Sequence, residues 1–390
     1  MGQVEAFAAE WEALLVRTQS PEIFRSWPWI ASWWQIFGGG AREPFVIVVR
    51  EGDTVVGLAP FLLRSITALG PARLRRLEFM GTGEDQPDEV CSDFLDLFAA
   101  AGHEDAVARA IWQRLLAERG SWDEAVFRSI LDGSLLTRLM QPMARQSGCG
   151  EISQHSGARF WVDLKDGSFG AYVERLSKKK RKRIFYYRRR LEKEGGIVER
   201  RLERKDEIPL FLSEIARLSR LRRGGKGMAS AWQSEKFRRF HDVLAPRLWD
   251  LGWLDLRLWL KEGRCVAALY NFIYEGTIYY YQSGFDTEAF GNVSPGLVTI
   301  SNVIEWGFQN QMKRYDFLVG AEGSYIEDYA CVTEAASDLT LHSPTGRGQV
   351  LRWARELKGI LSTARELVVP PRPREKAAPS SETVESSEAG

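Results

Sequence analysis

The sequence has few cysteines and no long apolar run, and each scarcity excludes a class of protein. The four cysteines, Cys91, Cys149, Cys265 and Cys331, are far apart. Their spacing argues against a zinc site and against a disulfide framework. No stretch approaches the ~20 apolar residues of a membrane-spanning helix, and the first residues lack the basic start and apolar segment of a secretory signal. We therefore expect a protein of a reducing compartment, in the cytoplasm or peripheral to the inner membrane, without a bound metal.

The sequence also has almost no net charge, +1 at pH 7. Lysine and arginine number 53 and aspartate and glutamate 52 in 390 residues, so an anionic partner must be held by a local patch rather than by a global field. The length and the 44% hydrophobic content allow two domains with a full core each. From Pro370 the composition turns to Pro, Ser, Glu and Ala, which predicts a disordered tail over 369–390.

Hydrophobic periodicity predicts an α+β unit over residues 1–155. Expected helices cover 4–15, 22–37, 103–119 and 134–146, and expected strands cover 44–50, 54–63, 73–79, 93–98 and 122–129. The helix at 22–37 holds four tryptophans, at positions 27, 29, 33 and 34. Such a density of large rings favours core or domain-interface packing over a ligand platform.

A second unit, over residues 156–368, repeats the plan. Residues 51–61 align without gaps onto 262–272, with Glu, Gly, Val, Leu and Phe at matching offsets. Duplication explains this match, and so does convergence of two hairpins, since both need a glycine turn followed by an apolar strand. A strand at 277–283, a helix at 295–311, a strand at 314–318 and a last helix at 349–367 follow.

The start of the helix at 295 is the most informative local feature. Ser294 suits the N-cap, Pro295 suits the first helical position, and Gly296 allows a ligand to approach the backbone. Such helix starts attract phosphate. The order strand, loop, helix, strand resembles the pyrophosphate-binding core of GNAT-fold acyltransferases, which makes Ser283, Ser294, Gly296 and Leu297 candidate cofactor-binding residues. An ordinary capped helix between two strands is the alternative.

A basic run provides the next signal, because nine of the thirteen residues from Lys178 to Arg190 are cationic. Lysine and arginine in a first turn oppose the helix dipole, and a bound anion would relieve that cost. The anion could be a CoA or nucleotide phosphate, an RNA backbone or a membrane surface, and a solvated basic face is the alternative. Candidate substrate-binding residues are Lys179, Arg181, Arg183 and Tyr281.

Together these segments resemble the CelD/BcsL-type acetyltransferases associated with cellulose and other exopolysaccharide synthesis. The resemblance is carried by 176–183, 188–191, 232–241, 263–268, 280–286, 294–296 and 315–320, with 24–34, 56–60 and 93–96 fitting as well. A weaker similarity to FemABX aminoacyl transferases centres on 177–194. The resemblance implies tandem GNAT-like (acyl-CoA N-acyltransferase) domains, each a mixed, mostly antiparallel sheet flanked by helices. It also implies acetyl-CoA or another acyl-CoA as co-substrate, without a metal. Where the family often has Tyr-Lys, this chain has Tyr325-Ile326.

Acyl transfer needs a base for the acceptor and an acid for the departing thiolate. No Ser-His-Asp order or reactive cysteine context is present, which favours direct attack on the thioester. Asp316 or Glu322 is the expected base, with Asp316 preferred because its neighbours would desolvate it, and Tyr325 is the expected acid. Each has a structural alternative: a cap or an ion pair with Arg314 for Asp316, plain surface for Glu322 and packing for Tyr325.

Two classes of function stay open. In the first, an acyl-CoA-dependent transferase, which the resemblance implies is an acetyltransferase, acts on a hydroxyl or amine of a sugar, sugar nucleotide or envelope precursor. In the second, a non-catalytic GNAT-fold protein serves exopolysaccharide synthesis as a scaffold, a reading that the sparse glycines of 284–296 support. Within the enzyme class, the FemABX similarity allows aminoacyl-tRNA as donor. The expected partners are a small-molecule or saccharide acceptor and an anionic carrier, with tRNA open.

Overall fold

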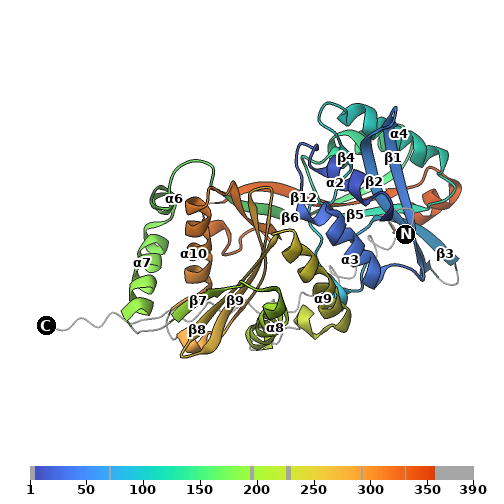
Figure 1. Cartoon of the computed structure of the whole chain (residues 1–390). Helices are drawn as coiled ribbons and strands as arrows, with labels where there is room; N and C mark the ends of the chain where they lie inside the picture. The colour runs from blue at the N-terminus through green and yellow to red at the C-terminus, as the bar shows by residue number, and fades with distance from the viewer. Residues whose placement is uncertain are drawn as a thin grey trace, which may run out of the picture.

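A computed structural model describes residues 5–69, 72–193, 197–224, 230–290, 293–329 and 331–355. Within these ranges the chain forms an elongated molecule of two lobes, each with its own helices, joined through a shared sheet (Figure 1). The strands follow one another in the order β1-β2-β3-β5-β12-β6-β11-β10-β9-β8-β7, and β4 pairs with β2 off this path. The two halves of the sequence are therefore linked by backbone hydrogen bonds.

The strands of the sheet are β1 Arg42–Glu51, β2 Thr54–Leu69, β3 Ala72–Phe79, β4 Phe98–Ala99, β5 Glu124–Leu131, β6 Gly150–Asp163, β7 Ile197–Arg201, β8 Leu254–Lys261, β9 Arg264–Tyr274, β10 Thr277–Phe285, β11 Arg314–Gly320 and β12 Val332–His342. The α-helices of the two lobes include α2 Ala8–Leu15, α3 Trp27–Phe37, α4 Glu104–Ala117, α5 Gln141–Gln146, α6 Phe169–Arg175, α7 Lys178–Lys193, α8 Ile208–Gly224, α9 Glu235–Asp250 and α10 Pro295–Gln309.

Both halves use the same strand pattern. In the first half β1, β2 and β3 are antiparallel neighbours, β5 is parallel to β3, and β12 is antiparallel to β5. In the second half β8, β9 and β10 are antiparallel, β11 is parallel to β10, and β6 is antiparallel to β11. The aligned segments 51–61 and 262–272 form corresponding hairpins, with Gly52 and Gly263 at positive φ in the turns. The repeated plan agrees with duplication.

The last strand of each half lies in the sheet of the other half. β6 follows the helices of the first half but pairs with β11, while β12 follows β11 but pairs with β5. The two exchanged strands also pair with each other along most of their length, and they cross the middle of the molecule in Figure 1. The domain boundary predicted at residue 155 lies inside β6, so the division at that residue stays a prediction.

Helices cover both faces of the second half of the sheet. α6, α7 and α10 pack on one face, and α8 and α9 lie on the other, where α9 lies beside α3 of the first half (Figure 1). The Trp29 ring contacts the Phe240 ring of α9 at 5.1 Å between centroids, and Trp29 and Trp33 are fully buried. The prediction that the tryptophan-rich helix packs in a core and at an interface is confirmed.

Two local predictions differ from the structure. The helix expected at 22–37 begins at Trp27, because Ser26 is extended and Pro28 occupies the first turn, and a short 3₁₀ turn precedes it. The strand expected at 93–98 is wrong apart from a two-residue pairing at its end. Phe94 there has φ of 59°, and the Asp96 carboxylate accepts the backbone amides of residues 97, 135 and 136. Local side-chain hydrogen bonds thus replace the strand ladder.

The end of the chain is described only in part. A helix covers residues 346–355, which agrees with the beginning of the helix expected at 349–367. The remainder of that helix and the tail predicted at 369–390 lie outside the described residues. No helix in the described ranges is long and apolar enough to cross a membrane.

Candidate functional site

The N-terminus of α10 opens toward a cavity. Ser294 precedes the helix and Pro295 occupies its first turn, which contains no acidic residue. Ser294 is the N-cap residue, as expected, but its side chain makes no capping hydrogen bond, so it does not occupy the first-turn amides. A Cβ placed on Gly296 would meet only the Phe285 ring, at 3.6 Å. The backbone at this helix start is therefore accessible to a ligand.

Two adjoining cavities meet over this helix start. The larger has a volume of about 790 Å³ and is lined by residues of α8, of the segment after β10 and of α10. The smaller, of about 230 Å³, is lined by the first turn of α7 and by Asp328. Both are lined by Ser294, Leu297, Tyr325 and Tyr329. We call the two together the α10 cavity.

Four cationic side chains line the α10 cavity. Arg222 of α8 lies over the Phe285 ring and donates to the Ser283 hydroxyl at 3.2 Å. Lys179, Lys180 and Arg183 come from α7. Three acids, Asp286, Glu288 and Asp328, lie at the same walls, and Arg264 neutralises Asp286 at 2.8 Å. The positive end of α10 adds to the cations, so the cavity attracts anions at the helix start.

Lys180 is the cation most altered by its surroundings. Its ammonium lies 3.3 Å from the centroid of the Tyr329 ring, an arrangement in which the ring stabilises the charge. Burial nevertheless lowers the pKa of Lys180 to about 8, while Asp328 opposes the change. This side chain can therefore gain or lose its proton near neutral pH.

Beside the cavity, β10 and β11 separate. Their parallel pairing ends at Tyr279 and Asp316, although β10 continues to Phe285 and β11 to Gly320. Bulges in both strands accompany the separation: the β10 register against β9 shifts after Tyr280, and Leu318 of β11 has φ of 68°. The separation leaves backbone groups of the two strands free of each other, next to the α10 helix start.

Aromatic side chains fill the base of this separation. The Phe317 ring lies 5.8 Å from Tyr280, 5.0 Å from Tyr315 and 5.1 Å from Tyr329, between centroids. The Tyr280 hydroxyl donates to Ser283 at 2.6 Å and also interacts with the Tyr325 hydroxyl. Burial raises the pKa of Tyr280. A chain of hydroxyls therefore runs from Ser283 through Tyr280 to Tyr325, which is 51% exposed.

The structure brings most of the predicted site residues together. Ser294, Gly296, Leu297, Tyr325, Lys179 and Arg183 all line the α10 cavity. Ser283 adjoins it through its hydrogen bonds to Arg222 and Tyr280. Arg181 instead forms an ion pair with Glu174. Tyr281 is buried and donates to the Val90 carbonyl at 2.7 Å, on the face of the sheet away from α10.

Asp316 lies in a buried ion network on the face of the sheet opposite α10. Its Oδ2 accepts from Arg159 Nε at 2.7 Å, and its Oδ1 accepts from the Leu318 amide at 2.9 Å. Arg159 Nη1 also donates to Glu22 Oε1 at 2.8 Å, and all three charged side chains are almost completely buried. Burial raises the pKa of Asp316, although Arg159 lowers it. The proton-transfer role of Asp316 stays a prediction.

Glu322, the other expected base, lies at the surface. Its carboxylate is 3.5 Å from His155 Nε2, and both side chains are more than half exposed. Glu322 lines neither part of the α10 cavity. Its role as a base also stays a prediction.

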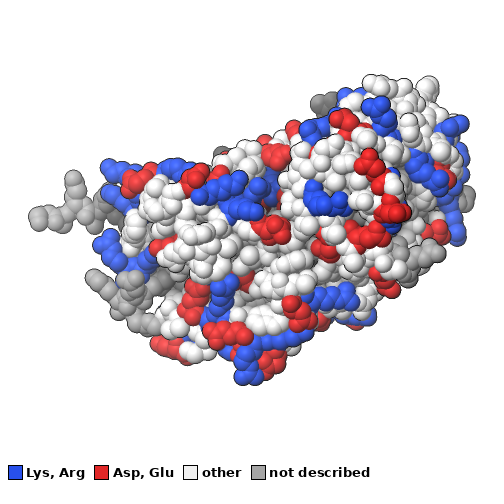
Figure 2. All heavy atoms as spheres, turned by 45° about the horizontal axis from the view of Figure 1, so that its top comes forward, with Lys and Arg blue, Asp and Glu red and all other residues white. Residues whose placement is uncertain are grey.

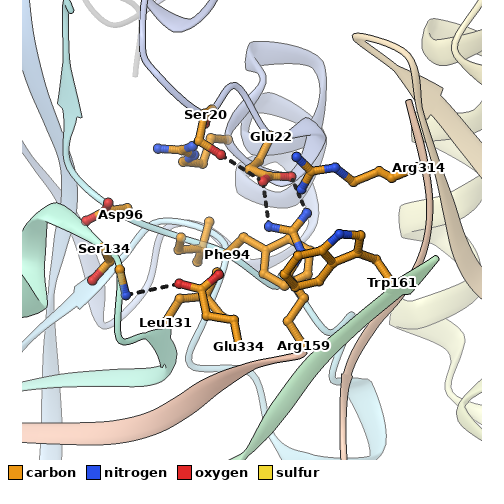
Figure 3. Close-up of a pocket in the computed structure, with 13 residues that line it drawn as sticks. Ser20, Glu22, Phe94, Asp96, Leu131, Ser134, Arg159, Trp161, Arg314 and Glu334 are labelled. Atoms are coloured by element: carbon orange, nitrogen blue, oxygen red, sulfur yellow. Dashed lines mark hydrogen bonds and ion pairs between the residues drawn. The ribbon is translucent and has the colours of Figure 1, made fainter. Parts of the chain in front are cut away.

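A separate cavity of about 320 Å³ lies between the halves, on the Arg159 face of the sheet (Figure 3). Figure 3 shows Arg159 held against Glu22, with Trp161 and Arg314 approaching from one side and Glu334 from below. Glu334 accepts the Gly133 amide at 3.0 Å. The Arg159–Glu22 ion pair in its wall links β6 to the first half.

Sequence reasoning missed Lys180, Arg222 and Tyr329, which line the α10 cavity, and Tyr280 beside it. Lys180 stands in a run of similar cations, and nothing local distinguishes the inward-facing member. Arg222 is far from α10 in the sequence, and only the packing of α8 brings it near. The tyrosines occur in apolar strands and loops, where a core role is the usual expectation.

Comparisons with known proteins agree with this architecture. Residues 178–329, less than half of the chain, match a family described as an acetyltransferase (GNAT) domain. This range begins at α7 and ends at Tyr329, so it holds the whole α10 cavity. A comparison with curated proteins finds no match.

Solved structures resemble the chain over both halves. The crystal structure of FemX superposes with a TM-score of 0.59 at 10% identity, covering 85% of this chain and 95% of that one. A conserved protein of unknown function from Bacteroides thetaiotaomicron superposes with a TM-score of 0.52 at 12% identity, covering 86% and 97%. A tandem GNAT protein from the clavulanic acid biosynthesis pathway gives 0.45 at 13% identity, covering 86% and 94%. At these identities the likeness concerns the fold.

The fold is thus an α+β, tandem GNAT-like fold, and residues 178–329 of its second half match the GNAT acetyltransferase domain model. The more specific resemblance to CelD/BcsL-type proteins stays a prediction. In the described part of the chain, no group of three or more His, Cys, Asp or Glu side chains is arranged to hold a metal ion.

Proposed function

We propose that the protein is an acyl-CoA-dependent acyltransferase, with acetyl-CoA as the first donor to test. The acceptor is a hydroxyl or amine of a sugar, sugar nucleotide or envelope precursor, as the CelD/BcsL resemblance suggests. The observation that carries the proposal is the α10 helix start, whose uncapped, acid-free first turn lies in a cavity lined by Arg222, Lys180 and Arg183. Backbone amides and cations together suit a pyrophosphate.

The corresponding helix of the first half lacks such a start. α4 occupies the corresponding place in the first half, between parallel neighbours β3 and β5. Its first turn contains Glu104 and Asp105, whose carboxylates already neutralise the helix dipole and would repel a phosphate. We therefore expect the first half to have a structural role and each chain to bind one donor molecule, in the second half.

The chemistry is direct transfer. The acceptor oxygen or nitrogen attacks the thioester carbonyl, the acceptor loses its proton to a base, and the sulfur of CoA leaves as a thiolate that takes up a proton. Tyr325 is the proposed acid that protonates the thiolate. Its position in both parts of the cavity and its interaction with Tyr280 support this role. Asp316 and Glu322 stay the proposed bases, with a structural role in the Arg159 ion pair as the alternative for Asp316.

The binding of the donor can be tested by calorimetry with acetyl-CoA and CoA. We expect binding to the wild type and a loss of at least about tenfold in Gly296→Val, because the added methyl groups would occupy the space of the phosphate. The folded protein should accommodate the change, since only the Phe285 ring lies near the new Cβ.

Thermal unfolding of Gly296→Val is the control for this experiment, and its midpoint should stay close to that of the wild type. If no CoA ester binds to the folded wild type, the scaffold function is favoured and the acyl-CoA proposal fails.

Aminoacyl transfer is the second candidate. The fold likeness to FemX extends over both halves of the chain, and the basic helix α7 could contact the backbone of a tRNA. A charged aminoacyl-tRNA that donates its amino acid in a reaction that acyl-CoA cannot support would favour this candidate.

A further inference from the structure

The cations of α7 divide into two sets. Those directed toward the protein have partners: Arg181 pairs with Glu174, Arg188 with Glu305 at 2.6 Å, and Lys180 lies on the Tyr329 ring. Lys178, Lys182 and Arg189 are exposed. Among side chains that the structure describes, no carboxylate lies within ion-pair distance of these three, and Arg189 Nε contacts only the Phe185 carbonyl, at 3.4 Å.

The unneutralised cations form a stripe together with two exposed rings. At 100° per residue, Lys178, Lys182, Phe185, Tyr186 and Arg189 lie within roughly 100° of the helix circumference. Phe185 is 43% exposed and Tyr186 is 56% exposed, while Ile184 and Tyr187 on the opposite side are buried. We call these five residues the outer stripe of α7. It combines positive charge with apolar surface and contains no acid.

The outer stripe lies at the end of the molecule. Figure 1 places α7 at the edge of the second lobe, outside α10, and Figure 2 shows Lys and Arg side chains along this end. The stripe lies on the exposed side of α7, opposite the buried Ile184 and Tyr187, so it faces away from the core of the second lobe.

We propose that the outer stripe of α7 binds the surface of an anionic lipid bilayer. Lipid phosphates would contact the cations at both ends of the stripe, and the rings between them would enter the boundary between headgroups and acyl chains. An RNA duplex would contact the cations through its phosphates but keeps its bases stacked inside the helix, away from the Phe185 and Tyr186 rings. The apolar Phe185 ring and the cations on either side of it match the headgroup boundary of a bilayer, and unpaired RNA bases, which also stack on such rings, are the competing partner.

This binding would orient the α10 cavity toward the membrane. Lys178 belongs to the stripe, and its neighbours Ser177 and Lys179 line the smaller part of the cavity. An acceptor carried in the headgroup layer would then reach the helix start without leaving the surface. The proposal does not depend on acyl transfer, because binding to lipid is measured without a donor or an acceptor.

The test is sedimentation of the full chain with vesicles of phosphatidylglycerol mixed with phosphatidylcholine, and with vesicles of pure phosphatidylcholine. We expect binding to the anionic vesicles alone, weakened by salt. Lys178→Ala/Lys182→Ala should bind about 25-fold more weakly, since each surface cation near an anionic bilayer accounts for about fivefold. Phe185→Ala should also weaken binding, and this loss should persist at high salt.

The matched control is Arg109→Ala/Arg128→Ala, which removes two exposed cations from the first half and should bind like the wild type. Equal losses in both double variants would overturn the proposal, because the attraction would then be global. So would absence of sedimentation with the anionic vesicles. Binding of total tRNA that depends on Lys178 and Lys182, without binding to vesicles, would assign the stripe to RNA instead.

Discussion

Lys180 shows how one residue of a basic run acquires a separate chemistry. Its neighbours on α7 are exposed or ion-paired, while Lys180 lies between the Tyr329 ring and the α10 helix start. Burial lowers its pKa to about 8, and a bound phosphate would raise that pKa again by stabilising the charge. Phosphate binding at the α10 cavity should therefore be coupled to protonation of this side chain.

The sign of this coupling gives a prediction. Below pH 8 Lys180 is already protonated in the free protein, so affinity for acetyl-CoA should be nearly constant. Above pH 8 the Lys180 side chain of the free protein is neutral and must take up a proton before it can bind the phosphate. The affinity for acetyl-CoA should therefore fall, by about tenfold in total, because one charge-assisted hydrogen bond contributes about that much. Calorimetry between pH 7 and pH 9 measures this fall, because that range covers about one pH unit on either side of the pKa of Lys180.

Lys180→Arg is the informative variant, because arginine stays charged over this range and should abolish the fall in affinity. Lys182→Arg, on the outer stripe, is the matched control and should keep it. A wild type whose affinity does not change with pH would contradict the assignment of Lys180 to the phosphate.

Among single residues, the sequence identifies those that a local sequence pattern marks. It misses those that only the packing of distant helices brings to the site. Ser294, Pro295 and Gly296 are recognisable because a helix start requires particular residues. The side chain of Ser294 nevertheless makes no cap, since the choice between capping and another rotamer is made by the surroundings. Lys180 and Arg222 need the positions of α7 and α8, which no local pattern specifies.

β11 shows how an element can present different chemistry on its two faces. Tyr315 and Phe317 pack toward α10, whereas Asp316 points to the opposite face and contacts Arg159. The Asp316 carboxylate also accepts the Leu318 amide, and this bond supports the positive φ of Leu318 at the point where β11 leaves β10. The carboxylate therefore holds the bulge and neutralises a buried guanidinium.

These contacts predict the effect of Asp316→Asn. The change keeps the size of the side chain but leaves Arg159 with Glu22 as its remaining charged partner, and breaking one member of a buried ion network costs about 3–5 kcal/mol. We expect a clearly lower melting temperature and little change in acetyl-CoA affinity. Thermal unfolding and calorimetry on the same preparation measure both.

The opposite pattern would identify Asp316 as the base. Turnover lower by about 10²–10⁴ at an unchanged melting temperature is typical of a lost general base. Glu322→Gln serves as the control, because Glu322 is exposed and its loss should leave the melting temperature unchanged.

The sequence predicts the elements better than their ends and their exceptions. The hairpins, α4, α10 and β11 follow from periodicity and turn residues. The strand expected at 93–98 fails because its apolar residues are buried in an irregular loop, where the Asp96 carboxylate takes the place of a neighbouring strand. Periodicity reports burial, and it cannot tell whether a sheet or a side chain satisfies the backbone.

At the scale of the whole molecule, the exchange of β6 and β12 decides how the halves depend on each other. The pattern of two similar units is visible in the sequence, since 51–61 and 262–272 align. The exchange is not, because the same strands could pair within either half without changing their sequence pattern. A boundary placed by composition alone consequently falls inside β6.

The exchange predicts that the first half cannot fold alone as residues 1–155. Such a fragment lacks β12, whose Leu339 and Leu341 are buried in the core of the first half. Burial of two leucines contributes about 3–6 kcal/mol, a large share of the ~5–15 kcal/mol that stabilises a typical domain. The fragment also ends within β6 and exposes β5 as an unpaired edge.

We therefore expect the full chain to unfold in one cooperative transition and the fragment 1–155 to show no cooperative melting by circular dichroism. Joining residues 332–342 to that fragment through a Gly/Ser linker should restore a transition, because β12 would again pair with β5. A joined segment in which Leu339 and Leu341 are replaced by serine is the matched control and should not restore it. A fragment 1–155 that melts cooperatively without the added strand would mean that the first half is stable by itself and that β12 only fastens it to the second.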